Sequence, residues 1–219
     1  MKKLTIVLLC SVLASGISHA QVRVESSWFS NVAVGIVNPL PVSSQELHFK
    51  NWNVEWSFNL YKALWRPSHN YFCLTLGADL VFPTMRAAEP VQYAKGNDNI
   101  LTVKELPDGI DFKRSRIGVT QLRVPFSLGI VTFKDFGIEV GAAADLNLYA
   151  ASKAVYKSGN TRTRLVEKNI KTNPVGFDFF ALVHLDWFSL YAKYSPAWVM
   201  NTAGPTWQCW SVGIRLNFD

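Results

Sequence analysis

Side chains able to do chemistry are few in this sequence and lie far apart. Beyond residue 20 the histidines are His48, His69 and His184, with no HExxH or CxxC spacing. Metal sites need clustered ligands, so we expect no metal. The sequence also lacks a G-x-S-x-G nucleophile elbow and a P-loop, so we expect no catalytic residue and no cofactor. Cys73 and Cys209 are predicted to be unpaired residues inside the fold.

Charged side chains form a second set, because they occur at alternate positions inside apolar runs. The set comprises Glu55, Asp79, Arg123, Glu139, Asp145, Asp178, Lys193 and Arg215. Five of these residues are acids and three are bases, so they can pair with one another. Burying charge is unfavourable unless both signs meet. The set therefore predicts a polar network inside the fold, provided that the charged face of each run points inward.

The runs that carry these charges alternate between apolar and polar residues, which is typical of β-strands. Eight such runs occur, at residues 31–36, 52–60, 72–82, 121–130, 138–148, 175–185, 188–194 and 209–218. After residue 20 no apolar run is long enough for a transmembrane helix. Short and long connections take turns along the chain. The pattern predicts an all-β, eight-stranded antiparallel up-and-down barrel, with a bulge or kink at Pro125.

Two kinds of eight-stranded barrel fit this alternation, and they differ in which face is inside. A soluble lipocalin-like barrel is apolar inside, whereas a membrane barrel is apolar outside and polar inside. Small residues recur on the polar faces, as a narrow eight-stranded interior requires; the glycines are Gly35, Gly77, Gly129, Gly141, Gly176 and Gly213. Aromatic residues collect near both ends of the strands, like the girdles of membrane barrels. We therefore expect a transmembrane β-barrel in which Trp56 faces lipid and Glu55 faces the lumen.

The first 20 residues have the form of a secretory signal peptide. Lys2 and Lys3 precede an apolar stretch, and residues 18–20 form a small-x-small cleavage site. We expect residues 1–20 to be removed and residues 21–219 to form a barrel in the outer membrane. Removing two lysines and no acid lowers the formal charge from +6 to +4. A charge this small does not favour a nucleic-acid partner.

Several segments resemble a known group of proteins. They read GVTQLRVPFSLGI (118–130), FGIEVGAAADLNLYA (136–150) and, near the end of the chain, LYAKYSPAW and SVGIRLNF. These segments are similar to the PorT-like small outer-membrane β-barrel domain family of Bacteroidota. The resemblance covers residues 118–218 well and the first half by pattern alone. It implies an eight-stranded outer-membrane barrel with long surface loops and no shared catalytic residues, and it links a few members to secretion or gliding machinery.

A basic segment, residues 152–172, is expected to form one of the long loops. Its candidates for contact with an anion are Lys157, Arg162, Arg164 and Lys168, because arginine and lysine pair well with phosphate. The expected ligand is lipopolysaccharide of the outer leaflet or another anionic partner. An ordinary solvated loop would have the same composition.

These patterns favour a monomeric, non-enzymatic outer-membrane barrel with a plugged lumen. Its expected role is surface interaction, or membership of a membrane complex with an unidentified protein partner. Two alternatives stay open. A lipid A-modifying barrel enzyme would need His48 beside Ser43 or Ser44 and a carboxylate at the outer rim, since His184 is expected to be a hydrogen-bonded lumen residue. The other alternative is a soluble lipocalin-like ligand-binding barrel.

Overall fold

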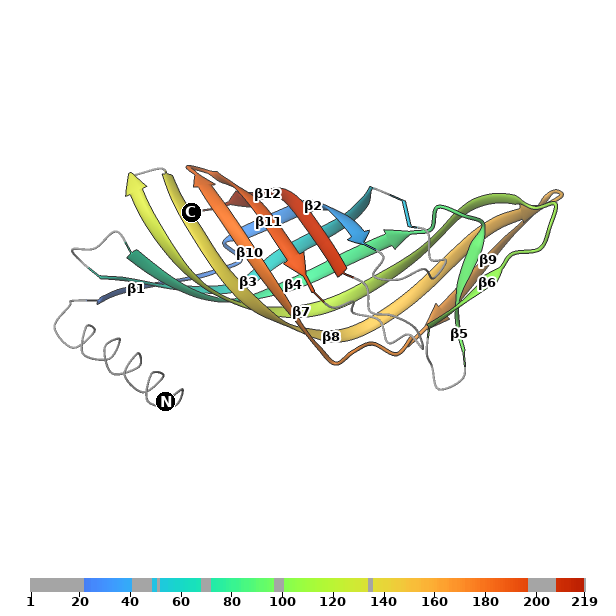
Figure 1. Cartoon of the computed structure of the whole chain (residues 1–219), viewed down its shortest axis with the longest axis horizontal. Coiled ribbons are helices and arrows are strands. Elements are labelled where there is room, and N and C mark those ends of the chain that lie inside the picture. Colours follow the sequence, from blue (N-terminus) through green and yellow to red (C-terminus); the bar gives the residue numbers. More distant parts are fainter. Residues whose placement is uncertain are drawn as a thin grey trace.

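The computed structural model describes residues 22–40, 49–50, 52–67, 72–96, 101–133, 136–196 and 208–218. Most of these residues lie in β-strands, and eight of the strands form a barrel (Figure 1). The barrel strands are β2 (Asn31–Leu40), β3 (Asn53–Pro67), β4 (Phe72–Arg86), β7 (Asp111–Phe133), β8 (Phe136–Ser158), β10 (Val175–Leu185), β11 (Phe188–Ser195) and β12 (Gln208–Asn217). Within the described ranges, no helix is long and apolar enough to cross a membrane. The predicted signal peptide lies outside these ranges and stays a prediction.

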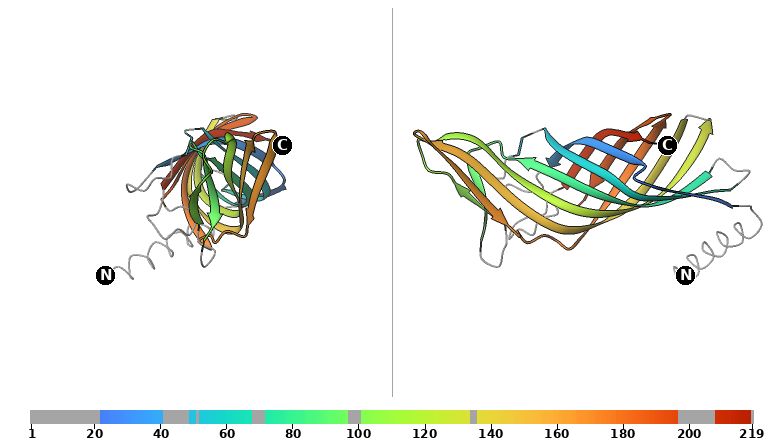
Figure 2. Two further views of the ribbon diagram at one scale, coloured as in Figure 1. Left: turned by 90° about the vertical axis from the view of Figure 1, so that its right-hand side faces the viewer. Right: turned by 180° about the vertical axis from the view of Figure 1, so that it is seen from behind.

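The barrel strands pair in chain order, and every pairing is antiparallel. The ladders run from β2 through β3, β4, β7, β8, β10 and β11 to β12. β12 then pairs with β2 along its whole length, which closes the ring. Figure 2 shows the strands grouped around a common axis when the molecule is viewed from one end. The predicted all-β, eight-stranded, antiparallel up-and-down barrel is confirmed.

The two faces of the wall differ sharply in polarity. On β3, Asn53, Glu55 and Ser57 are buried, whereas Trp56 and Phe58 are exposed. The other strands follow the same rule, and their exposed side chains include Leu76, Phe126, Leu128, Ile138, Val140, Phe177, Phe179, Leu190, Val212 and Ile214. A barrel that is apolar outside and charged inside is suited to a lipid environment. It is the reverse of the lipocalin-like alternative, which needs an apolar cavity.

Exposed aromatic residues mark both ends of the apolar wall. At the end with short turns they include Trp28, Phe72, Trp187 and Phe218. At the opposite end they include Trp52, Tyr149, Tyr194 and Trp210. The amphipathic rings of tryptophan and tyrosine favour the boundary between hydrocarbon and water, so these two groups match the girdles of a membrane barrel.

Close packing between β2, β11 and β12 explains two of the interior glycines. Tyr191 points across Gly35 and Gly213, and a Cβ added at Gly213 would lie 2.3 Å from the Val34 carbonyl oxygen and 2.6 Å from Tyr191 Cε1. The Val34 oxygen belongs to the paired backbone of β2, so it cannot move without breaking the ladder. Glycine at this position is therefore required by sterics.

Gly213→Ala is expected to destabilise the barrel by about 1–3 kcal/mol, the usual range for overpacking a tight interior. The measurement is urea unfolding in detergent micelles, followed by tryptophan fluorescence. Gly118→Ala is the matched control, because the nearest atom to its added Cβ is Thr84 Oγ1 at 4.0 Å. Equal midpoints for the two variants would contradict the steric explanation.

The basic segment predicted to be a loop is instead a continuation of the sheet. β8 runs on to Ser158, and β9 (Thr161–Lys168) folds back and pairs with it. The alternation of β8 is interrupted by a register shift opposite Thr120 and Gln121, where Leu148 and Tyr149 are both exposed. Such a bulge moves all later side chains to the other face. The alternation of apolar and polar residues in the sequence therefore stops at Leu148, although the strand itself continues to Ser158.

The predicted connection between residues 83 and 115 also contains regular structure. β4 extends to Arg86, β7 begins at Asp111, and between them lie β5 (Val91–Lys95) and β6 (Leu101–Glu105), which pair with each other. β7 and β8 continue beyond the barrel as part of an outer sheet. The β5–β6 hairpin packs on the inner face of this extension (Figure 1). A cluster of buried apolar side chains lies there: Val37, Met85, Ala87, Tyr93, Leu101, Ile117, Val119, Ala150, Ile170 and Cys209.

The register is the same on both sides of Pro125, so the predicted bulge is wrong, while the alternative of a kink stays a prediction. The β4–β7 ladder is interrupted where Pro125 lies opposite Gly77. An additional strand, β1 (Val22–Trp28), pairs with residues 61–67 of β3. Cys73 and Cys209 are buried and unpaired, as predicted.

Candidate functional site

The lumen contains a cluster of ion pairs centred on Arg123 of β7. Its Nε donates to Asp145 Oδ1 at 2.8 Å, and one terminal nitrogen donates to Asp178 Oδ2 at 2.7 Å. The other terminal nitrogen lies 3.8 Å from Glu55 Oε1. These carboxylates come from β8, β10 and β3, so one guanidinium group joins strands on opposite sides of the barrel.

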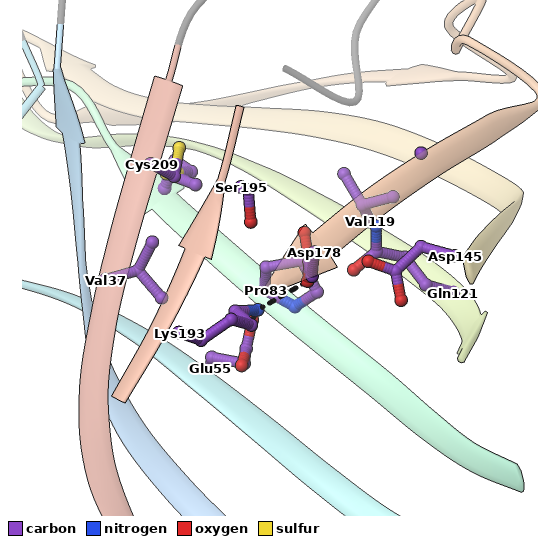
Figure 3. A pocket seen from close by; sticks show the side chains of 12 residues that line it. Val37, Glu55, Pro83, Val119, Gln121, Asp145, Asp178, Lys193, Ser195 and Cys209 are labelled. Carbon is purple, nitrogen blue, oxygen red and sulfur yellow. Dashed lines mark hydrogen bonds and ion pairs between the residues drawn. The ribbon is translucent and has the colours of Figure 1, made fainter. Parts of the chain in front are cut away.

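A second cation, Lys193 of β11, completes the cluster. Its Nζ donates to Glu55 Oε2 at 2.5 Å and lies 3.4 Å from Asp178 Oδ2. Figure 3 shows Lys193, Glu55 and Asp178 pointing toward one another beneath the apolar side chains of Val37, Val119 and Cys209. Lone buried charges are very unfavourable, but paired charges that also make hydrogen bonds can be held rigidly. The cluster therefore fills this part of the lumen with side chains that hold one another in place.

The other predicted lumen residues lie apart from this cluster. Asp79 is buried and accepts a hydrogen bond from Asn59 Nδ2 at 2.8 Å. Arg215 points inward beside Tyr191, and its Nε has no hydrogen-bond partner among the described residues. Glu139 lies lower in the barrel, where Ser127 Oγ donates to its Oε1. The eight residues therefore share the lumen, but only Glu55, Arg123, Asp145, Asp178 and Lys193 form one network.

Glu139 belongs to a chain of hydrogen bonds that has the connectivity of a nucleophilic triad. His184 Nε2 lies 2.8 Å from Glu139 Oε2, and His184 Nδ1 lies 2.9 Å from Ser189 Oγ. Ser189 is 0% exposed, however, and its Oγ also accepts from Asn217 Nδ2 at 3.0 Å. A nucleophile needs open space beside its oxygen for the substrate carbonyl. This geometry holds β8, β10, β11 and β12 together rather than presenting a reactive serine.

The cavities inside the barrel are small. One of about 40 Å³ separates the ion-pair cluster from the outer apolar cluster, and another of about 20 Å³ lies beside Tyr191 and Arg215. Ligand pockets usually measure about 300–1,000 Å³. A hollow of about 320 Å³ opens at the short-turn end, beside Glu25, Lys62 and His184. The two lumen cavities thus have room for a few water molecules but not for a ligand, whereas the hollow at the short-turn end reaches the lower limit of the usual range.

No group of three or more histidine, cysteine, aspartate or glutamate side chains in the described ranges is arranged to hold a metal ion. The residues considered for a lipid-modifying site, His48, Ser43 and Ser44, lie outside the described residues.

The four residues predicted to contact an anion lie on the outer sheet. Lys157 is on β8, and Arg162, Arg164 and Lys168 are on β9. Strand pairing brings them to the same face as Arg114 and Arg116 of β7, which the sequence analysis did not include. The available signal was the alternation of Arg114 and Arg116 with Ser115 and Ile117, which continues the pattern of β7 toward the N-terminus.

Comparison with known proteins adds little to this description. No protein-family model matches the chain, and no curated protein matches it. One similar solved structure is the crystal structure of Ail, the attachment invasion locus protein of Yersinia pestis. The identity is 9%, the match covers 91% of this chain and 99% of that chain, and the TM-score is 0.37. The fold assignment therefore depends on the strand pairing above, and the resemblance to the PorT-like family stays a prediction.

Proposed function

We propose that this protein is a non-enzymatic outer-membrane β-barrel that holds a rigid sheet above the membrane surface for interaction with other molecules. The barrel acts as the anchor, and the outer parts of β7, β8 and β9 with the β5–β6 hairpin act as the exposed unit. The protein functions as a monomer in the membrane or as one component of a larger membrane complex. The single observation that carries this proposal is the continuation of an apolar barrel wall into a polar, folded sheet.

The length of the apolar wall supports a membrane position. On β7, outward apolar side chains run from Leu122 to Ile130, and on β8 they run from Ile138 to Leu146. Each stretch covers nine residues, and a tilted strand needs about 9–11 residues to cross the hydrocarbon layer. A closed barrel also leaves no unpaired strand edge in lipid. The outer membrane is the compartment in which such barrels are found.

The length of β7 and β8 supports a role outside the membrane. Each strand has 23 residues, about twice the number needed to cross the bilayer. The surplus lies at the end opposite the short turns, where β9 adds a third strand. Folding this surplus into a sheet with its own apolar cluster is unnecessary for an anchor alone. A preformed outer sheet is suited to binding without a large ordering cost.

The closed lumen and the buried serine support a role without transport or catalysis. The ion-pair cluster blocks the axis of the barrel, and Ser189 is inaccessible to a substrate. The lipid-modifying alternative depends on His48, Ser43 and Ser44, which lie outside the described residues.

Surface labelling tests the proposal. A short epitope inserted between Gly159 and Asn160, at the β8–β9 turn, is expected to be detected by antibody on intact cells and to be removed by external protease. The barrel is expected in the outer-membrane fraction, and the purified protein is expected to give no large stable conductance steps in planar bilayers. The control epitope is placed after Asp186, in the short β10–β11 turn, and is expected to be detected only after lysis. Recovery of the protein in the soluble periplasm would contradict the proposal.

A further inference from the structure

One face of the outer sheet carries a concentrated set of cations. Residues directly opposite each other in an antiparallel ladder point to the same face, so the pairings of β7, β8 and β9 identify its members. We name this surface the basic face; it consists of Arg114, Arg116, Lys153, Lys157, Arg162 and Arg164. Lys168 lies on the same face of β9, opposite Ala151, and Arg86 of β4 lies opposite Arg116.

Like charges on the basic face lie directly opposite one another. Arg116 faces Lys153 across the β7–β8 ladder, and Lys157 faces Arg162 across the β8–β9 ladder. Like charges in such positions destabilise a sheet. An isolated sheet would therefore gain stability from an anion placed between these pairs.

The described part of the chain itself forms no ion pair with the six cations of the basic face. Among the described residues, no ion pair joins any of its six cations to a carboxylate. Asp111 lies opposite Lys157 and so shares this face, but its carboxylate forms its ion pair with Lys113, at 2.6 Å. Glu167 lies close in sequence, but it is opposite Ser152 and therefore belongs to the other face. The positive charge of the basic face is thus left for a ligand or for solvent ions.

The cations are held near one another rather than spread apart. Val155 lies on the basic face between Arg114 and Arg164, yet it is only 1% exposed, so neighbouring side chains cover it. The long apolar stems of arginine can cover such a residue while the charged ends stay in water. Partial burial, and after it the positive charge of Arg164 and its arginine neighbours, lowers the pKa of Lys153.

The position of the basic face relative to the apolar wall indicates the kind of anion. On β8 the exposed apolar side chains end at Leu148 and Tyr149. Strands rise about 3.4 Å per residue and tilt by about 45°, so Lys153 lies about 10 Å and Lys168 about 5 Å above Tyr149. The headgroup layer extends about 5–8 Å beyond the hydrocarbon on each side. Lys168 is therefore level with the lipid headgroups, and Lys153, in the lowest part of the basic face, lies just above them.

We propose that the basic face binds the phosphate groups of a phosphorylated glycolipid in the outer leaflet around the barrel. This inference rests on the proposed outer-membrane location. Arginine can form two parallel hydrogen bonds to a phosphate, and the rows of cations on adjacent strands suit a headgroup with more than one phosphate. The bound lipid would neutralise the opposed cations and fix the outer sheet against the membrane surface.

The test measures binding of diphosphoryl lipid A to the detergent-folded protein by native mass spectrometry, with dephosphorylated lipid A as the reference. The unchanged protein is expected to prefer the phosphorylated lipid, and Arg116→Gln combined with Arg164→Gln is expected to weaken that binding at least about tenfold. The matched control is Lys95→Gln with Lys104→Gln, which removes two charges from the β5–β6 hairpin, on the other side of the outer sheet, and is expected to keep the binding. Added salt should weaken binding to the unchanged protein.

Two results would overturn the inference. One is equal binding of phosphorylated and dephosphorylated lipid A by the unchanged protein. The other is tight binding of the soluble phosphorylated headgroup without acyl chains, which would identify a soluble anion as the ligand. Both variants are also assayed for surface detection of the Gly159–Asn160 epitope. If they stay in the outer membrane while lipid binding is unaffected, only the lipid inference fails, whereas loss of the unchanged protein from the membrane would overturn the proposed function.

Discussion

Replacing Arg123 with methionine is expected to lower the free energy of unfolding of the barrel by about 3–5 kcal/mol, the usual effect of removing one partner from a buried ion pair. Arg123 is buried and contacts Asp145, Asp178 and Glu55. Methionine fills much of the same volume, so the loss of unfolding free energy results from the missing positive charge rather than from a cavity. Urea unfolding in detergent micelles measures the loss.

Two controls separate charge from packing in this experiment. Arg123→Met combined with Asp145→Asn and Asp178→Asn is expected to recover most of the lost stability, because no unpaired carboxylate then faces the missing guanidinium group. Arg114→Met removes an exposed arginine from the outer sheet and is expected to change stability by less than about 0.5 kcal/mol. If the triple variant were no more stable than Arg123→Met, the electrostatic explanation would be wrong.

Tyr93→Ala is expected to loosen the outer sheet by about 3–5 kcal/mol, as for other large-to-small changes at buried aromatic positions. Tyr93 is 0% exposed, its ring stacks on Phe49 with centroids 5.5 Å apart, and Ser152 Oγ donates to its backbone carbonyl. Since Tyr93 belongs to the hairpin above the barrel, the loss should be local. Hydrogen exchange of the β8 and β9 amides measures it, while the unfolding midpoint of the barrel should change little.

Tyr93→Phe is the matched control, because the buried phenol oxygen has no hydrogen-bond partner among the described residues. Removing that oxygen is expected to be neutral or stabilising. Burial raises the pKa of Tyr93, so its contribution is complete below the unfolded pKa of about 10 and is lost as pH rises above it. The phenylalanine variant should lack this alkaline loss. Equal hydrogen exchange in the alanine and phenylalanine variants would show that the ring does not hold the outer sheet.

The barrel could be predicted because its pattern is local. Residues such as Trp56 and Glu55 alternate within one strand, and the number, order and polarity of the eight runs can be read without knowing which strands touch. The inward direction of the charged face followed from a physical limit, since a narrow interior accepts glycine and paired charges but not unpaired ones. Gly213 beside Tyr191 is an example of that limit.

The outer sheet could not be predicted because its pattern is interrupted. The bulge at Leu148 and Tyr149 reverses the alternation of β8, so the local pattern ends ten residues before the strand itself ends at Ser158. Hairpin β5–β6 is short and gains most of its stability from packing on β7 and β8, which no local pattern reports.

The sequence by itself determined the all-β class, the eight barrel strands, and which side chains face the lumen. Only the tertiary structure decided that Arg123 joins three carboxylates from three other strands, and that Arg116 and Lys153 share a face while Glu167 lies on the other. The physical reason is that alternation depends on the geometry of one strand, whereas contacts depend on the register between strands. Register is fixed by bulges and by pairing between residues far apart in the chain.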